Sequence, residues 1–162
     1  MTYDRARLQA ELIRDEGERL NAYRCTAGKL TIGVGRNLDD VGIRPDEQRR
    51  LGLTVERCKY RTGITRAQSR ALLAADIDAC EAEADRRFPW WRKLDPVRQR
   101  VLLNMLFNMG GATLATFRNT LAAMARQDFA AAVRGMRASR WHDQVGARAV
   151  RLEHMMETGE PA

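Results

Sequence analysis

Lysine, proline, cysteine and aromatic residues are all scarce in this sequence of 162 residues. It holds three lysines, four prolines and three cysteines, and aromatic residues make up 6% of it. The cysteines, Cys25, Cys58 and Cys80, are odd in number and widely spaced, which argues against a disulfide framework. Neither they nor His142 and His154 show the spacing of zinc ligands, so we expect no metal and no other cofactor.

Long apolar runs are missing as well. No stretch approaches the roughly 18 consecutive apolar residues of a membrane span, so no stable membrane insertion is expected. The first residues carry Arg5, Arg7 and Glu11 and show no apolar signal segment. At 44%, the hydrophobic content is too high for a disordered chain. We therefore expect a single globular domain, made and held in reducing cytoplasm.

Arginine, by contrast, is abundant. The chain has 25 arginines, and its 28 basic residues against 21 acidic ones give a formal net charge of +7. Such a charge favours a polyanionic partner, which at this point could be nucleic acid, a membrane surface or a cell wall.

The periodicity of the apolar residues predicts an α+β chain that is predominantly helical. A first helix is expected over residues 4–16, and a period of two over residues 20–38 predicts a small antiparallel sheet of two or three strands. Within it, Leu30 to Gly35 should alternate, with Thr31 and the glycines on one face. That glycine face is open to close approach by a ligand or another backbone, which makes Gly35 a candidate contact.

Further along the chain, several helix starts are marked by capping residues. Arg44-Pro45 favours a short helix, and residues 57–61 are interpreted as a solvated loop. Thr65 and Gln68 form a capping box at the start of a long helix over about 65–85. Asp95-Pro96 predicts an N-cap for a helix that is apolar nearly all round and therefore central to a bundle. Amphipathic helices are predicted around it, over 113–125, 128–138 and 146–157.

Glu16 is the most unusual residue of the first helix. Leu8, Leu12 and Glu16 share one helical face, so the apolar stripe ends in a carboxyl group at the helix C-terminus. Partial desolvation and the negative end of the helix dipole both favour the protonated form of that group. A glycosidase general acid needs this property, although a structural carboxyl satisfied by an arginine would fit the same pattern.

Residues 15–25 and 28–35 resemble the signature of the bacteriophage lysozymes of the T-even-phage endolysin type, glycoside hydrolase family 24. The match is the spacing of Glu16, Cys25 and Thr31, with eight and then five residues between them. The segments 104–110, 117–120 and 139–144 resemble later blocks of the same family, in the same order. The resemblance implies hydrolysis of bacterial peptidoglycan at the β-1,4 bond between N-acetylmuramic acid and N-acetylglucosamine, that is, a muramidase.

The resemblance also implies a lysozyme-like architecture. A small sheet-bearing lobe over about 14–64, a connecting helix over 65–85 and a helical lobe over 86–162, joined by the helix 4–16, would enclose a cleft. Glu16 would be the acid, with Cys25 and Thr31 positioning the water.

The remaining site residues follow from the same resemblance. Gly35, Phe107 and Asn108 would contact substrate. Trp141 would pack behind the latter two, and Arg148 would pair with Glu16.

Two positions depart from the family pattern. Many members have an aspartate where this chain has Cys25, a thiol that is a poor base at neutral pH. The usual Gly-His is Gly35-Arg36 here, and the residue aligned with the partner of that histidine is Asp76. We therefore predict an Arg36–Asp76 ion pair, less sensitive to pH than its histidine counterpart because arginine does not titrate.

Two other functions stay open. A basic helical protein that binds nucleic acid would share the charge, although no helix-turn-helix, zinc-finger or RNA-binding pattern is found. An inactive cell-wall-binding relative of the lysozymes would share the motifs. The expectation taken forward is a monomer that binds peptidoglycan and no nucleic acid. It would be held in the host cytoplasm until lysis and would act on the periplasmic cell wall.

Overall fold

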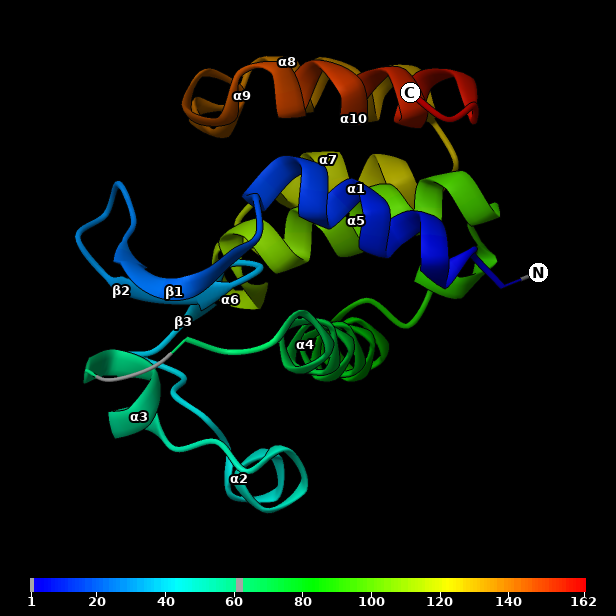
Figure 1. Ribbon diagram of the computed structural model, residues 1–162. Helices are drawn as coiled ribbons and strands as arrows, with labels where there is room; N and C mark the ends of the chain where they lie inside the picture. The colour runs from blue at the N-terminus through cyan, green and yellow to red at the C-terminus, as the bar shows by residue number, and fades with distance from the viewer. Residues whose placement is uncertain (1, 61–62) are drawn as a thin grey trace. The chain divides into compact units, whose positions relative to one another are not determined.

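The computed structural model describes residues 2–60 and 63–162, which contain one small sheet and a larger number of helices (Figure 1). The strands are β1 (Arg19–Arg24), β2 (Leu30–Gly33) and β3 (Arg36–Asn37). The helices are α1 (Arg5–Glu16), α2 (Pro45–Leu51), α3 (Val55–Tyr60), α4 (Arg66–Arg87), the 3-10 turn η1 (Trp91–Lys93), α5 (Pro96–Met109), α6 (Gly111–Leu114), α7 (Arg118–Ala125), α8 (Phe129–Arg137), α9 (Arg140–Val145) and α10 (Ala147–Thr158). The predicted α+β, mainly helical class is confirmed. Over the described residues, no helix is both long enough and apolar enough to cross a membrane.

The chain forms two compact units. One, called the sheet unit here, comprises residues 9–76, and the other, the helical unit, comprises residues 2–8 and 77–162. The boundaries fall inside α1 and inside α4, so each of these helices begins in one unit and ends in the other.

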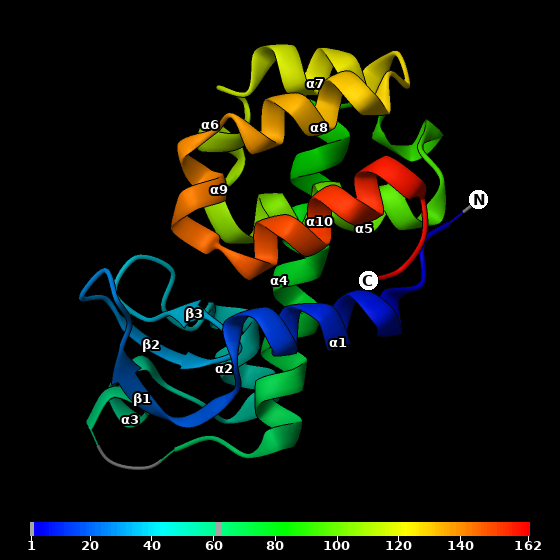
Figure 2. The same ribbon diagram turned by 90° about the horizontal axis from the view of Figure 1, so that it is seen from above.

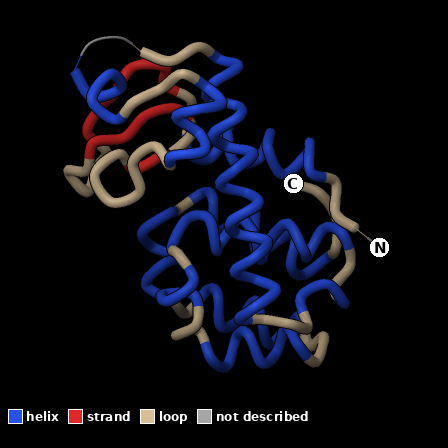
Figure 3. The backbone as a smooth tube through the Cα atoms, turned by 90° about the horizontal axis from the view of Figure 1, so that it is seen from below, coloured by secondary structure: helices blue, strands red, loops and turns tan. Residues whose placement is uncertain are grey.

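The three strands form an antiparallel sheet in the order β1-β2-β3, drawn in red in Figure 3. Tyr23 lies opposite Thr31, and Thr31 lies opposite Asn37. The alternation predicted to run to Gly35 is wrong beyond Gly33. There the strand ends, because Gly33 and Gly35 both adopt left-handed backbone angles, with φ of +64° and +69°, and turn the chain into β3.

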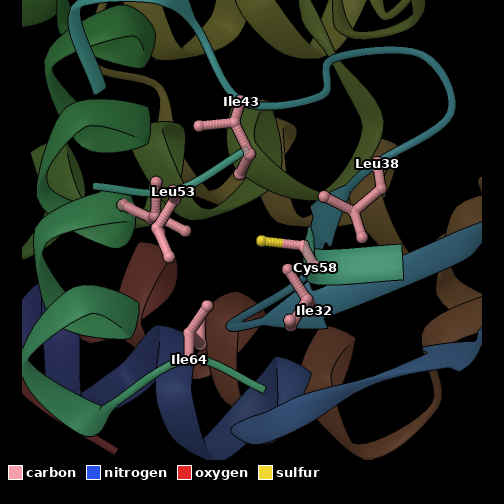
Figure 4. Close-up of a cluster of buried hydrophobic side chains, with 7 residues drawn as sticks. Ile32, Leu38, Ile43, Leu53, Cys58 and Ile64 are labelled. Atoms are coloured by element: carbon pink, nitrogen blue, oxygen red, sulfur yellow. The ribbon is translucent and has the colours of Figure 1, made fainter. Parts of the chain in front are cut away.

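A hydrophobic cluster forms the core of the sheet unit. Figure 4 shows the Cys58 sulfur pointing into the middle of this cluster, between side chains of the sheet and of the segments that follow it. Its buried members are Ile32, Leu38, Ile43, Leu53, Cys58, Ile64 and Leu72. The sheet therefore packs one face on the segment that leads into α4.

The loop predicted over residues 57–61 is wrong for residues 57–60, which belong to α3; Arg61 lies outside the described residues. The helix begins after Thr54, whose hydroxyl accepts the Arg57 backbone N–H at 3.0 Å. This is an N-cap, and burial of Cys58 adds the tertiary packing that a helix of six residues needs. The start of α2 at Pro45 agrees with the prediction.

Helix α4 begins with the predicted capping box. The Gln68 N–H donates to the Thr65 hydroxyl at 3.1 Å, and the Thr65 N–H donates to the Gln68 side chain at 2.8 Å. Leu73 and Ile77, four residues apart on α4, are buried. A helix of this length is therefore supported both by its cap and by its packing.

The helical unit is built around α5. The Asp95 carboxylate accepts the backbone N–H groups of Val97 and Arg98, which confirms the predicted cap, and residues 99–106 of α5 are buried. In this unit α7 lies beside α8, and α10 packs against both α8 and α5 (Figure 2).

Two details of the helical unit differ from the prediction. Residues 113–125 do not form one helix, because the Thr116 and Phe117 N–H groups bond the carbonyls three residues earlier and end α6. Helix α9 was not predicted; it begins where the Ser139 hydroxyl accepts the His142 N–H at 3.2 Å.

Candidate active site

Glu16 is the last residue of α1, and its carboxyl group lies directly over Gly35. A Cβ atom on Gly35 would lie 3.2 Å from one carboxylate oxygen of Glu16. Gly17 ends the helix in a left-handed conformation, with its N–H on the Ile13 carbonyl at 2.9 Å. The space left by the missing side chain at position 35 is therefore occupied by the Glu16 carboxyl group.

The space beside Gly33, the second glycine of this face, is also filled by a side chain of the protein. A Cβ on Gly33 would lie 3.2 Å from the Ser69 hydroxyl of α4. The close approach expected at this glycine face is made at Gly33 by a small polar side chain of α4. A sequence pattern shows that side chains are missing, but it does not show what takes their place.

Cys25 lies in the turn that joins β1 to β2, and Thr31 lies on β2. The turn is closed by the Cys25 N–H on the Lys29 carbonyl at 2.9 Å. The Thr31 side chain is buried, and its hydroxyl is 3.1 Å from the Lys29 carbonyl oxygen and also bonds the Cys25 sulfur. Thiol and hydroxyl therefore form one polar group at this end of the sheet.

The surroundings of Cys25 favour its thiolate more than the sequence suggested. Burial on its own would raise the pKa of this thiol. Hydrogen bonds to its sulfur from the backbone amides of Lys29 and Ala27, and from the Thr31 hydroxyl, outweigh burial and bring the pKa below its ordinary value. The sequence analysis considered only the ordinary pKa of a thiol and did not find these backbone donors.

Tyr23 connects the two parts of the site and was not singled out from the sequence. It is half-buried, lies opposite Thr31 across the sheet, and has the Arg19 guanidinium 4.4 Å from its ring centre. Burial raises the pKa of the phenol, Arg19 lowers it, and the charges of Glu16 and Cys25 raise it further. Tyr23 therefore lies within electrostatic reach of both groups and stays a neutral hydrogen-bond donor.

The predicted ion pair between Arg36 and Asp76 is present. The Arg36 Nε and Nη2 groups donate to the two carboxylate oxygens of Asp76 at 2.9 and 2.8 Å. Arg36 is buried and directly follows Gly35, the residue over which the Glu16 carboxyl group lies. The pair thus fixes β3, which begins directly after Gly35, to α4.

Glu47 is a second carboxylate on the same guanidinium, and the sequence analysis did not find it. Arg36 donates to its two oxygens at 2.7 and 2.8 Å, and the Arg44 N–H donates to it at 2.8 Å. Burial would raise the pKa of Glu47, but these bonds and the charges of Arg36 and Arg44 bring it to about 2. Its position at N3 of α2, in a capping box, was the available signal.

Three of the predicted site residues lie together in the helical unit. Phe107 and Asn108, at the end of α5, are half-buried. Trp141 of α9 is buried, and its indole N–H donates to the Asn108 amide oxygen at 2.8 Å. Trp141 therefore orients the Asn108 side chain. Phe107 and Asn108 both remain partly accessible.

Arg148 of α10 also belongs to the helical unit. It is buried, and its Nε donates to the Asn104 amide oxygen at 2.9 Å. Asn104 is thus a positioning partner that the sequence analysis did not identify. The pairing of Arg148 with Glu16 stays a prediction.

A pocket of about 840 Å³ opens in the helical unit beside Trp141. Arg118 and Arg140 both line it, together with Phe117 and several hydroxyl and amide side chains, and its described lining contains no carboxylate. The pocket therefore offers an aromatic wall and two cations to a polar, anionic ligand.

These features point to a class of fold. A mainly helical chain with one small three-stranded antiparallel sheet, and with a carboxyl group at the end of the first helix, has the α+β architecture of a lysozyme-like fold.

Comparisons with known proteins agree with this class. The family model described as phage lysozyme matches residues 14–154, so the chain belongs to the phage lysozyme family and is a lysozyme-type glycosidase. Two relatives from Dictyostelium discoideum, probable T4-type lysozymes 1 and 2, are each 29% identical and align over 90% of both chains. The pre-baseplate central spike protein Gp5 of Enterobacteria phage T4 is 32% identical over 93% of this chain, which corresponds to 28% of the spike protein.

Proposed function

We propose that this chain is an endolysin that hydrolyses the β-1,4 bond between N-acetylmuramic acid and N-acetylglucosamine in peptidoglycan. The observation that carries the proposal is the Glu16 carboxyl group held over Gly35, in the same unit as the Cys25–Thr31 pair. Membership of the phage lysozyme family supports it independently.

In the proposed reaction Glu16 is the general acid. Its proton passes to the glycosidic oxygen as the bond to the anomeric carbon breaks, and water then adds to that carbon. The Thr31 hydroxyl and the Cys25 sulfur position this water. The lowered pKa of Cys25 leaves a larger fraction of its sulfur as thiolate, and this thiolate accepts the proton that the water loses as it adds to the anomeric carbon.

Substrate contacts are assigned to both units. Gly35 and the accessible parts of Phe107 and Asn108 would contact the sugars, while Trp141, Arg148, Arg36 and Asp76 support them. The pocket with Arg118 and Arg140 suits the carboxylates of the stem peptides attached to the glycan. No metal ion has a role in this reaction, so chelators should leave the rate unchanged.

The test is clearing of outer-membrane-permeabilised Gram-negative cells by the wild type and four variants. Glu16→Gln should abolish clearing and Thr31→Ala should lose much of the rate. Cys25→Asp should stay active because a carboxylate can also hold and accept from the water, and Cys25→Ser reports what the sulfur adds. Clearing by Glu16→Gln at the wild-type rate would disprove the mechanism, and NMR of the first-formed anomer would distinguish inversion from retention.

A second candidate, a lysozyme module carried in the virion, is favoured by the similarity to the phage T4 spike protein. Immunoblots of infected cells and of purified virions separate the two. A free endolysin gives a band near 18.4 kDa in the cell lysate, whereas a virion module gives a longer polypeptide in the particles.

A further inference from the structure

Glu16 contacts Gly35, and the segments that follow these two residues are both attached to helix α4. Glu16 is followed by Gly17, which has a left-handed backbone and no side chain to hold it, and then by Glu18 at the start of the sheet. Any rotation at Gly17 would swing the end of α1, and with it the Glu16 carboxyl group. What holds Glu18 therefore bears on where Glu16 points.

Glu18 is held by two neighbouring residues of α4, and the Arg66 guanidinium of the same helix lies 3.8 Å from one of its oxygens. The Arg70 guanidinium donates to both of its oxygens, at 2.8 and 2.9 Å, and the Ser69 hydroxyl donates to one of them at 2.9 Å. Only 11% of the Glu18 side chain is exposed. A bidentate arginine and a hydroxyl in partly desolvated surroundings fix both the position and the orientation of this carboxylate.

The other side of the Glu16 contact is attached to the same helix. Gly35, beneath the carboxyl group, precedes Arg36, which is bonded to Asp76. Arg70 and Asp76 are six residues apart on α4, or about 9 Å along the helix. The first half of α4 thus holds the segment that leaves Glu16 and the glycine on which Glu16 rests.

We propose that Glu18 is a positioning residue, whose bonds to Ser69 and Arg70 fix the direction of the Glu16 carboxyl group over Gly35. The inference rests on the proposed function, in which Glu16 is the acid. It adds a residue that neither touches the substrate nor takes part in proton transfer. The Arg70 hydrogen bond is the main reason that the pKa of Glu18 is lowered, so the ion pair persists across the working pH range.

The test compares Glu18→Ala with the charge-swapped double variant Glu18→Arg/Arg70→Glu. In Glu18→Ala we expect kcat to fall about tenfold while KM stays within about twofold, because misdirection of an acid affects the chemical step more than binding. The nuclear Overhauser effect between the Glu16 Hγ and Gly35 Hα protons should weaken in parallel. The charge swap should restore both. Glu18→Gln, which keeps an acceptor for Ser69, provides the same readings if the alanine variant folds poorly.

The matched control is Glu83→Ala, which removes another arginine-bonded carboxylate of α4, paired with Arg87 at 2.8 Å. An equal loss of kcat in this control, or an unchanged kcat and Overhauser effect in Glu18→Ala, would overturn the positioning role. Glu16→Gln is assayed beside them. Full activity of that variant would overturn the proposed function, whereas the Overhauser effect would still decide whether Glu18 directs Glu16.

Discussion

At the scale of single residues, Glu16 and Gly35 depend on each other. The carboxyl group occupies the space where a side chain at position 35 would be, and the left-handed angle of Gly35 is one that only glycine adopts without strain. Gly28 has a similar angle, with φ of +77°, but nothing lies within 4 Å of its missing Cβ. A comparison of substitutions at these two glycines therefore separates the effect of backbone strain from the effect of crowding the Glu16 carboxyl group.

We predict that Gly35→Ala and Gly28→Ala lower the free energy of unfolding by a similar amount, about 1 kcal/mol, because both place an alanine in a left-handed conformation. Only Gly35→Ala should lose most of the lytic activity, because it displaces the Glu16 carboxyl group. Urea denaturation and cell-clearing rates at a temperature where both variants are folded would check this. Equal activity of the two variants would contradict it.

Cys25 and Cys58 should differ in reactivity because their surroundings differ. Hydrogen bonds lower the pKa of Cys25, whereas burial raises the pKa of Cys58. We predict that iodoacetamide near neutral pH modifies Cys25 well before Cys58 and slows lysis as it does so. Peptide mapping by mass spectrometry gives the order, and Cys25→Ser provides the control whose activity the reagent should not change. Faster loss of the Cys58 thiol would refute the prediction.

At the scale of elements, Arg36 joins three of them. One guanidinium of β3 binds Glu47 of α2 and Asp76 of α4, and it also donates to the carbonyls of Gly42 and Leu72. All of its donors are therefore used in a buried site. An arginine keeps its charge at any pH at which the protein is folded, so the guanidinium itself adds no pH dependence to this junction.

The lowered pKa of Glu47 predicts where stability depends on pH. A carboxylate whose pKa falls from 4.5 to about 2 on folding contributes its full stabilisation above 4.5 and loses it as the pH falls towards 2. We expect Glu47→Gln to lower the free energy of unfolding near pH 7 by on the order of 3 kcal/mol. This difference from the wild type should shrink below pH 4.5, as measured by urea denaturation. Asp46→Asn, at the exposed neighbouring position, is the control. A difference independent of pH would exclude Glu47 as its source.

The elements that could be predicted from the sequence are those with strong local signals. Thr65 with Gln68, and Asp95 with Pro96, satisfy backbone groups within a few residues, so pattern and structure agree there. Helices α3 and α9 have six residues each and a single hydroxyl cap, and they need tertiary packing to persist. That packing is not visible in periodicity.

For the candidate site, the same division holds. The motif spacing predicts Glu16, Cys25 and Thr31 as site residues, and the departure at position 36 predicts the Arg36–Asp76 pair that the structure shows. Glu18 bonds Arg70, 52 residues away, and no local pattern indicates such a partner. The capping box marks Glu47, but it does not indicate the bond to Arg36. Long-range pairing of charges is set by the packing of whole elements.

At the scale of the whole molecule, the net charge of +7 favours encounter with an anionic cell wall. Raising the ionic strength from about 0.01 to 0.15 M shortens the screening length from about 30 to about 8 Å. We predict that KM for isolated peptidoglycan sacculi rises over this range while kcat changes little. An uncharged soluble oligosaccharide of the same sugars should show no such dependence, and an equal salt effect on both substrates would contradict steering by charge.

The division of the chain also sets an order in which its contacts can form during synthesis. Residues 2–8 belong to the helical unit, where Tyr3 bonds Glu81 and packs its ring 6.3 Å from that of Trp91. A ribosome adds residue 3 long before residues 81 and 91, so this segment has no native partner until the first half of the chain has been made. The sheet unit, continuous in sequence, can complete its own contacts first. Residues 2–8 are therefore made before the sheet unit but find their native partners after it.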